Sequence, residues 1–396
     1  MKQTALDRLT QHIHTPTALL ILDDGTIFEG TGYGAETIRV GEVCFNTSMT
    51  GYQEIMTDPS YAGQVITFTF PHIGNVGANS IDIETSTPAA LGMITRERPG
   101  EASNYRASSS LSQWLSDNGL PGIGGIDTRA LTQRIREKGA PNGVIAVNYR
   151  GEFNRDALLE MARDWPGLKG MDLAQSVTRD APGTWQDSIW DKTTDTYLTN
   201  SDTSLRIIAL DYGCKQNILR CLKEEGCEIQ VVPATTKASD IIALKPDGIF
   251  LSNGPGDPAA TASYAAEEIR KLAAAGLPVF GICIGHQLIA EAFGAATFKM
   301  KRGHRGANHP VKDLSTGRIE ITSQNHGFAV DPDSLPPHLE VTHISLFDGS
   351  IEGLRHRELP VFSVQYHPES SPGPHDSRYL FSRFTDLIRK TTHAAS

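Results

Sequence analysis

The fold of the second half of the chain is decided by the stretch Pro278-Val-Phe-Gly-Ile-Cys-Ile-Gly-His-Gln287. Its apolar start predicts a buried strand over residues 278–282, and the apolar side chains on one side of residues 284–293 predict a helix. Glycines flank the cysteine in a G-x-C-x-G pattern and allow the sharp turn that joins strand to helix. Such a turn presents the Cys283 thiol at the sheet edge, beside helix amides that favour a thiolate. We therefore predict Cys283 as a nucleophile rather than a buried structural cysteine.

Outward from this stretch, short apolar runs alternate with amphipathic ones. The pattern predicts a mainly parallel sheet with helices on both faces, an α/β fold. Ligands of such sheets bind beyond the carboxyl ends of the strands. The predicted strands are 207–210, 228–232, 248–251, 278–282 and 361–365, and the predicted helices are 214–225, 265–275 and 284–293.

The first part of the chain is rich in short β-like runs and turns. The residues Asp23-Asp-Gly25 between two apolar runs predict a tight hairpin. We predict an α+β domain rich in strands over residues 1–150, a connector over 151–204 and the α/β domain over 205–396.

A candidate base follows the last predicted strand, in the sequence Tyr366-His-Pro-Glu369. His367 falls on the same sheet edge as Cys283, and Glu369 can turn back across the proline to hold the imidazole. A carboxylate on one ring nitrogen leaves the other nitrogen to take the thiol proton. His-Pro pairs are common in loops, so this motif alone is weak evidence for a catalytic base. It indicates one here because a G-x-C-x-G pattern lies upstream.

Two further polar segments follow predicted strands. The loop Leu251-Ser-Asn-Gly-Pro-Gly-Asp-Pro258 is rigid, and its amides can face an oxyanion together with the amide of Ile284. It lacks the G-K-[ST] of a phosphate-binding loop. Residues 324–330 follow the predicted strand 319–322 and can offer backbone contacts to a small substrate.

Composition excludes several classes of protein. The net charge of −10 disfavours nucleic acid and anionic membranes as partners. No apolar stretch approaches ~20 residues, and the N-terminus lacks the apolar core of a secretory signal. The five cysteines form no C-x-x-C pair, so we expect reduced thiols and a cytoplasmic protein. His304, His309 and His326 match no familiar metal-ligand spacing, so we expect no metal site.

Together the motifs resemble those of the triad-type, class I glutamine amidotransferases. The matching segments are Gly281-Ile-Cys-Ile-Gly-His-Gln287, Asn253-Gly-Pro-Gly-Asp-Pro258 and His367-Pro-Glu369. The first half resembles the first domain of the carbamoyl-phosphate synthase small subunit. The segments that carry this likeness are Phe45-Asn-Thr-Ser-Met-Thr-Gly-Tyr-Gln-Glu54, Thr57-Asp-Pro-Ser-Tyr61, Pro71-His-Ile-Gly-Asn-Val-Gly77, Ile126-Asp-Thr-Arg129 and Ser371-Pro-Gly-Pro-His-Asp376.

The resemblance implies that Cys283 attacks the side-chain amide of L-glutamine to form a glutamyl thioester. It also implies that His367 protonates the departing ammonia and then activates water, and that Glu369 orients His367. Ammonia would pass to a large subunit that uses ATP, Mg²⁺, K⁺ and bicarbonate to make carbamoyl phosphate for arginine and pyrimidine biosynthesis. The small subunit would need no cofactor of its own. The implied glutamine contacts are Ser48, Gly254, Gly256, Ile284, Gln287, Asn325, Gly327 and Phe328.

The chain departs from the family pattern at two positions. Tyr366 stands where a glycine commonly precedes His-Pro-Glu, and this larger side chain would crowd the base. Ile284 stands for a leucine, which is harmless because a backbone amide is used. Three alternatives stay open: the glutaminase part of another amidotransferase, a stand-alone γ-glutamyl peptidase, and a catalytically dead scaffold. The N-terminal domain argues against the first two and the intact triad against the third; we expect that domain to dock to the large subunit.

Overall fold

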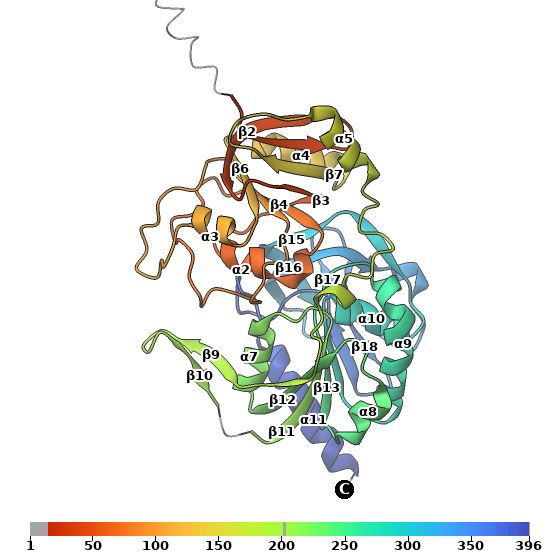
Figure 1. Cartoon of the computed structure of the whole chain (residues 1–396). Coiled ribbons are helices and arrows are strands. Elements are labelled where there is room, and N and C mark those ends of the chain that lie inside the picture. The colour runs from red at the N-terminus through yellow and green to blue at the C-terminus, as the bar shows by residue number, and fades with distance from the viewer. Residues whose placement is uncertain (1–14, 201–202, 396) are drawn as a thin grey trace, which may run out of the picture.

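The computed structural model describes residues 15–200 and 203–395, which form a barrel beside a large twisted sheet (Figure 1). The barrel is built by the first part of the chain and the sheet by the second part. None of the helices within the described residues has the length and apolar character needed to cross a membrane.

Seven short strands close the barrel in the order β1-β2-β6-β5-β4-β3-β7. Antiparallel pairing of β1 with β2 confirms the predicted hairpin at Asp23–Gly25. Each strand sends apolar side chains to a buried core, which explains why runs this short are stable. The strands are β1 (Ala18–Leu22), β2 (Ile27–Gly34), β3 (Ile38–Asn46), β4 (Gln64–Phe68), β5 (Gly92–Ile94), β6 (Pro121–Gly124) and β7 (Asn142–Val147).

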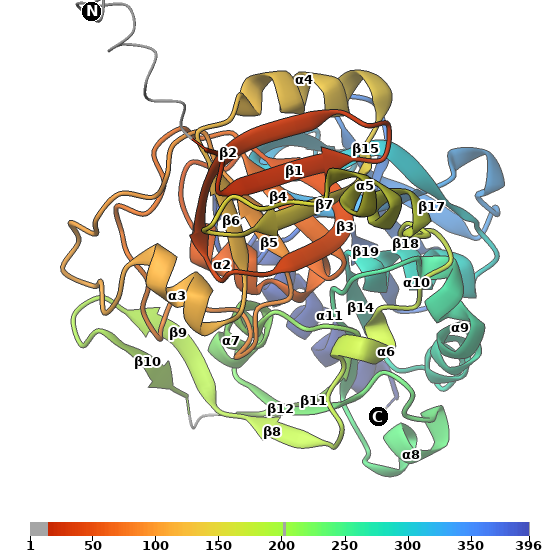
Figure 2. The same ribbon diagram turned by 45° about the horizontal axis from the view of Figure 1, so that its top comes forward.

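Helices flank the barrel, and Figure 2 shows α4 and α5 on its outside. Asp127 begins α4 because its side chain accepts a hydrogen bond from the Ala130 amide at 3.0 Å. Ser110 and Asn154 cap α3 and α5 in the same way. The helices of this region are α2 (Tyr52–Thr57), η1 (Pro59–Tyr61), α3 (Leu111–Asp117), α4 (Thr128–Lys138) and α5 (Arg155–Asp164).

The second part is centred on five parallel strands in the order β19-β14-β13-β11-β12. These are the parallel strands that the sequence predicts: β11 (Leu205–Asp211), β12 (Cys227–Pro233), β13 (Gly248–Leu251), β14 (Val279–Ile282) and β19 (Val361–Val364). Antiparallel strands extend the sheet at both edges. They are β8 (Gly183–Trp185), β15 (Thr297–Asp313), β16 (Ile319–Val330), β17 (Leu339–Ser345) and β18 (Ile351–His356).

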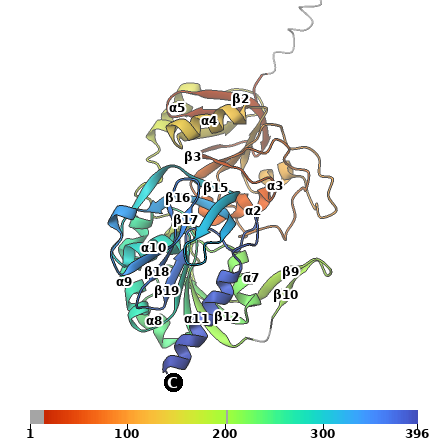
Figure 3. The ribbon, with the colours of Figure 1, turned by 180° about the vertical axis from the view of Figure 1, so that it is seen from behind.

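Helices cover both faces of this sheet, as predicted. One face packs against α7 (Gln216–Glu224) and α11 (Tyr379–Ala395), seen together in Figure 3. The other face packs against α8 (Ala238–Ala243), α9 (Pro258–Ala274) and α10 (Ile284–Ala292). Phe280 and Phe362 stack at 4.5 Å between ring centroids on the first face, and burying such a side chain stabilises the fold by about 1.5–3 kcal/mol.

The segment between barrel and sheet is packed rather than free. Helix α5 packs against the outside of the barrel, on β1 and β7, while β8 pairs with β12. The hairpin of β9 (Asp187–Asp191) and β10 (Thr196–Thr199) lies against α7, where the Arg220 guanidinium sits 3.8 Å from the Tyr197 ring centre. Two short elements complete the chain: α6 (Ala174–Val177) in this segment and η2 (Pro332–Ser334) after β16.

Two elements differ from the sequence prediction. Residues 324–330 continue the strand β16 instead of forming a loop, because they pair with the long strand β15, which we did not predict. Helix α9 begins at Pro258 rather than near residue 265, because Asp257 caps it through the Ala259 amide.

Polar contacts join the barrel to the sheet at the carboxyl ends of the parallel strands. Asn325 Nδ2 donates to Asp58 Oδ2 at 3.1 Å, and Asn253 Nδ2 donates to Ser60 Oγ at 2.9 Å. The region that holds the predicted active residues is therefore closed on one side by the first domain.

Candidate active site

The Cys283 turn has the backbone that a nucleophile elbow requires. Cys283 lies between β14 and α10 with φ 56° and ψ −107°, a conformation that costs energy for any residue with a side chain. Its amide donates to the Val364 carbonyl at 3.0 Å. A Cβ on Gly285 would overlap the Leu251 carbonyl oxygen, so this glycine is required by close packing. The strain at one buried thiol supports a functional role for Cys283.

His367 lies just beyond β19, beside this turn. Its amide donates to the Ser323 carbonyl at 2.9 Å, and its Nδ1 donates to Glu369 Oε1 at 2.7 Å. Burial disfavours the imidazolium, but Glu369 and then the Cys283 thiol outweigh it and raise the pKa of His367 to about 10. Because Nδ1 contacts Glu369, Nε2 is the ring nitrogen that remains free to take the thiol proton.

A lysine that the sequence analysis missed supports the same carboxylate. Lys215 Nζ lies 2.8 Å from Glu369 Oε1 and donates to the Ser370 carbonyl at 2.7 Å. Burial raises the pKa of Glu369, but Lys215 and then His367 lower it to about 2. Burial lowers the pKa of Lys215, but Glu369, then Asp58 and Glu84, raise it above its ordinary value. Lys215 and Glu369 therefore form a buried ion pair behind the imidazole.

The two glycines of the 251–258 loop are required by close packing against neighbouring backbone. A Cβ on Gly254 would collide with the Tyr212 carbonyl, and one on Gly256, whose φ is +94°, would lie 2.7 Å from the Met171 carbonyl oxygen. Ile284 is the first residue of α10, where amides have no partner inside the helix. Such free amides can stabilise an oxyanion formed at Cys283.

A cavity of about 30 Å³ opens at the thiol between barrel and sheet. Its size matches one or two water molecules. The lining includes Cys283 and six of the predicted glutamine contacts: Gly254, Gly256, Gln287, Asn325, Gly327 and Phe328.

Several polar side chains orient this lining. Gln287 Nε2 donates to the Phe328 carbonyl at 2.8 Å and to Gln365 Oε1 at 2.9 Å. The Cys283 thiol donates to the Asn325 carbonyl at 3.6 Å. Arg305, which the sequence analysis missed, is buried and also lines the cavity, and its guanidinium lies 3.3 Å from Glu42 Oε1.

Ser48 is placed differently from the other predicted contacts. It is buried after β3, and its amide donates to Asn46 Oδ1 at 2.7 Å. It is not among the cavity-lining residues, although the amide of its neighbour Thr47 reaches the Arg305 carbonyl at 3.4 Å. Its contact with glutamine stays a prediction.

Within the described residues, one group could hold a metal ion, namely His304, His326 and Glu352.

Tyr366, the larger residue at the family's glycine position, is fully buried. Its ring packs edge-on against His343, with 5.8 Å between ring centres. The side chain therefore points into the core, which accommodates it without displacing the His367–Glu369 contact.

Two family models and several known proteins are similar in sequence to this chain over most of its length. A family model described as Glutamine amidotransferase class-I matches residues 208–387, and one described as Carbamoyl-phosphate synthase small chain, CPSase domain, matches residues 20–145. The carbamoyl phosphate synthase small chain of Bradyrhizobium diazoefficiens is 59% identical, over 96% of this chain and 97% of its own length. That of Ruegeria pomeroyi is 57% identical, over 93% and 95%. That of Rhizobium meliloti is 56% identical, over 96% of each chain.

Proposed function

Because the chain belongs to the family of carbamoyl phosphate synthase small chains, we propose that Cys283, His367 and Glu369 carry out its hydrolysis of glutamine. The observation that carries the proposal is the strained Cys283 turn beside an imidazole held at 2.7 Å by a buried carboxylate. A nucleophile, a base and an orienting group in this order are the parts that acyl transfer requires.

The reactive state is a thiolate beside an imidazolium, formed when the thiol proton moves to His367 Nε2, and the raised pKa of His367 favours this transfer. The thiolate attacks the side-chain carbonyl carbon of glutamine, and the resulting oxyanion is stabilised by the Ile284 amide and by the 251–258 loop. His367 then gives the proton to the leaving nitrogen, the C–N bond breaks, and ammonia departs. A glutamyl thioester remains on Cys283.

Hydrolysis of the thioester uses the same base. His367 takes a proton from water, the hydroxide attacks the thioester carbonyl, and the C–S bond breaks to release glutamate. The proton returns to the Cys283 sulfur. Glu369 keeps the imidazole in one orientation through both halves of the reaction, and Lys215 keeps Glu369 ionised in its buried position.

The ammonia passes to a large subunit that binds ATP with its Mg²⁺ and K⁺ ions and bicarbonate, and makes carbamoyl phosphate for arginine and pyrimidine synthesis. The partner and the glutamine substrate follow from the family, and the route of ammonia is part of the proposal. The barrel, which contains none of the triad residues, is the natural surface for docking to that subunit.

The test measures glutamate release from glutamine by the purified chain and by His367→Asn, each with and without a large subunit from this family. Loss of general acid–base catalysis lowers kcat by about 10²- to 10⁴-fold. We expect wild type to release glutamate faster with the large subunit and His367→Asn to stay slow with or without it. Equal rates for the two proteins would refute the role of His367, and no effect of the large subunit would refute ammonia transfer.

A further inference from the structure

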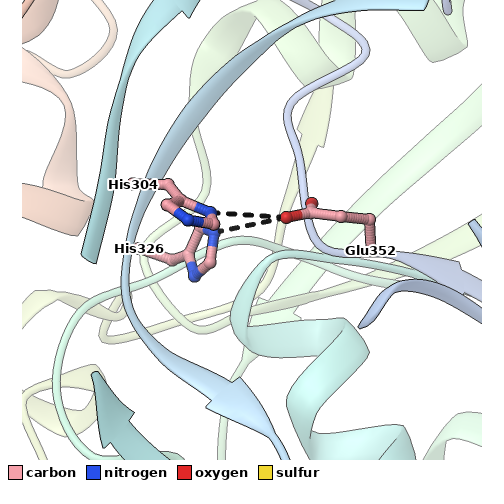
Figure 4. A group of neighbouring side chains, drawn as sticks. All are labelled: His304, His326 and Glu352. Atoms are coloured by element: carbon pink, nitrogen blue, oxygen red, sulfur yellow. Dashed lines mark ion pairs between the residues drawn. The ribbon is translucent and has the colours of Figure 1, made fainter. Parts of the chain in front are cut away.

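A second group of titratable side chains lies beside the cavity (Figure 4). His304 on β15, His326 on β16 and Glu352 on β18 are buried and point toward one another. His304 Nδ1 lies 3.4 Å from Glu352 Oε1, and His326 Nε2 lies 3.9 Å from the same oxygen. One ligand atom from each residue lies within 4.8 Å of the other two. The mechanism of glutamine hydrolysis uses none of these atoms.

Each imidazole is held from outside through its other nitrogen. His304 Nε2 lies 2.9 Å from Asp348 Oδ2, and His326 Nδ1 lies 2.7 Å from the Phe328 carbonyl oxygen. Histidines that bind metals almost always donate their second nitrogen to a carboxylate or a backbone carbonyl, which fixes the ring and its tautomer. The two rings therefore have the outer contacts of metal ligands.

The carboxylate is oriented in the same way. Gln324 Nε2 donates to Glu352 Oε2 at 2.9 Å, while the Ser350 hydroxyl donates to Asp348 Oδ1 at 2.8 Å. Glu352 is fully buried, and these contacts leave Oε1 facing the two imidazoles. All three side chains are thus fixed by outer partners around a common centre.

Among the residues that the structure describes, the two imidazole nitrogens that face the centre of the cluster lack a hydrogen-bond partner. A carbonyl oxygen only accepts, so His326 carries a proton on Nδ1, and Nε2 is the ring nitrogen that faces the cluster. Within the described residues, neither His326 Nε2 nor His304 Nδ1 has a hydrogen-bond partner. His326 Nε2 therefore lies 3.9 Å from Glu352 Oε1 with no hydrogen bond between them, and a cation placed between the two atoms would bind both.

A proton on His304 does not complete the cluster. A proton on Nδ1 points to Glu352 Oε1, 3.4 Å away, and leaves His326 Nε2 unpaired.

We propose that His304, His326 and Glu352 bind one divalent transition-metal ion of the Zn²⁺ class, through two imidazole nitrogens and one carboxylate oxygen. Ligand atoms of a tetrahedral zinc site lie about 3.3 Å apart, given metal–ligand bonds of about 2.0–2.1 Å. The separations of 3.4 Å and 3.9 Å from Glu352 Oε1 are close to this value. Water would fill the fourth position.

A cavity reaches one side of the cluster. A cavity of about 420 Å³ is lined by Gly303, His304, Asp348 and Ser350, among others, and so reaches the His304 side of the cluster. Short-range sequence spacing did not indicate the site because its three ligands come from three different strands.

The role of the ion follows from its place in the sheet. His326 also lines the cavity at Cys283, and the Phe328 carbonyl accepts from both His326 Nδ1 and Gln287 Nε2. A metal on His326 would tie β16 to β15 and β18. It would stiffen the strand that carries Asn325 and Phe328 without touching the reacting atoms.

The test titrates metal-free protein with Zn²⁺ and with Co²⁺, followed by calorimetry and visible absorption. The protein carries Cys283→Ser so that the reactive thiol cannot compete for the ions. We expect one ion per chain and a Co²⁺ spectrum without a thiolate charge-transfer band. Affinity should fall by about 100-fold or more in Glu352→Gln, and by about 10- to 100-fold in Asp348→Asn, which removes only an outer partner.

Glu320→Gln is the matched control, because Glu320 is a buried carboxylate on the strand of His326 and outside the cluster. Its affinity for both ions should equal that of the parent protein. No stoichiometric binding, equal losses in Glu352→Gln and Glu320→Gln, or a charge-transfer band would each overturn the proposal. Anomalous diffraction from Zn²⁺-soaked crystals of the unaltered chain does not depend on any variant folding: a peak among the three side chains supports the proposal, and none overturns it.

Discussion

Two buried histidines on the same sheet have opposite charge preferences. His367 and His326 are 2% and 5% exposed, and each donates through Nδ1 over 2.7 Å. Burial disfavours the imidazolium at both, yet Glu369 raises the pKa of His367 to about 10, whereas the pKa of His326 stays well below 6.5 beside the Phe328 carbonyl. A carboxylate on Nδ1 therefore favours the charged form of a buried histidine enough to offset burial, whereas the carbonyl on His326 does not offset burial and the nearby charge of His304.

The largest expected effect on stability comes from removing Lys215, the cation that pairs with Glu369 behind His367. Lys215→Met takes the cation from Glu369 and leaves a carboxylate that is fully buried. Breaking a buried ion pair costs about 3–5 kcal/mol, so we expect the free energy of unfolding to fall by that amount in denaturant titrations.

A double variant tests whether the lost stability comes from the unpaired charge. Lys215→Met combined with Glu369→Gln should cost less than the two single changes added together, because no charge is left unpaired. Lys271→Met is the exposed control: it removes a lysine from Glu267 on the surface and should change stability far less. Strict additivity in the double variant would contradict the account of Lys215.

The pH dependence of stability should have opposite signs at the two histidines. The pKa of His367 is raised above 6.5 on folding, so its contribution is complete below pH 6.5 and is lost as pH rises toward 10. The pKa of His326 is lowered, so its contribution is lost as pH falls below 6.5. Each slope reaches at most about 1.4 kcal/mol per pH unit.

Free energies of unfolding from about pH 5 to pH 9 for wild type, His367→Asn and His326→Asn measure these slopes. The advantage of wild type over His367→Asn should shrink as pH rises. Its advantage over His326→Asn should shrink as pH falls. Slopes of the same sign at both positions would show that the partner of Nδ1 does not control the charge.

The smallest expected effect comes from replacing Gln287, which donates to the Phe328 carbonyl together with His326. Gln287→Leu removes its bonds to Phe328 and Gln365 but leaves His326 in place. Loss of a polar contact worth about 1–1.5 kcal/mol should raise KM for glutamine about tenfold and change kcat less. Gln113→Leu, on the outer helix α3, is the control and should leave KM unchanged. An unaltered KM in Gln287→Leu would remove Gln287 from the glutamine site.

The parts of the site that the sequence predicted lie within short contiguous stretches. G-x-C-x-G predicted a strand, a turn and a helix because the glycines and the apolar spacing act within a few residues. The His-Pro-Glu motif likewise places His367 and Glu369 two residues apart, and they meet at 2.7 Å.

The parts that the sequence did not predict depend on distant pairing. Lys215 reaches Glu369 only because β11 and β19 end at the same edge of the sheet. The strand β15 carries polar residues without regular alternation, and its pairing with β16, broken by register shifts, makes it a strand. The cluster of His304, His326 and Glu352 exists only after β15, β16 and β18 are folded into one sheet.

The most direct test of the central claim is mass spectrometry of the chain after reaction with a glutamine-mimicking electrophile. The account predicts one adduct per chain, located on Cys283, slowed by excess glutamine and strongly reduced in His367→Asn. An adduct that forms first on Cys214 or Cys221, or one on Cys283 that glutamine does not slow, would contradict it.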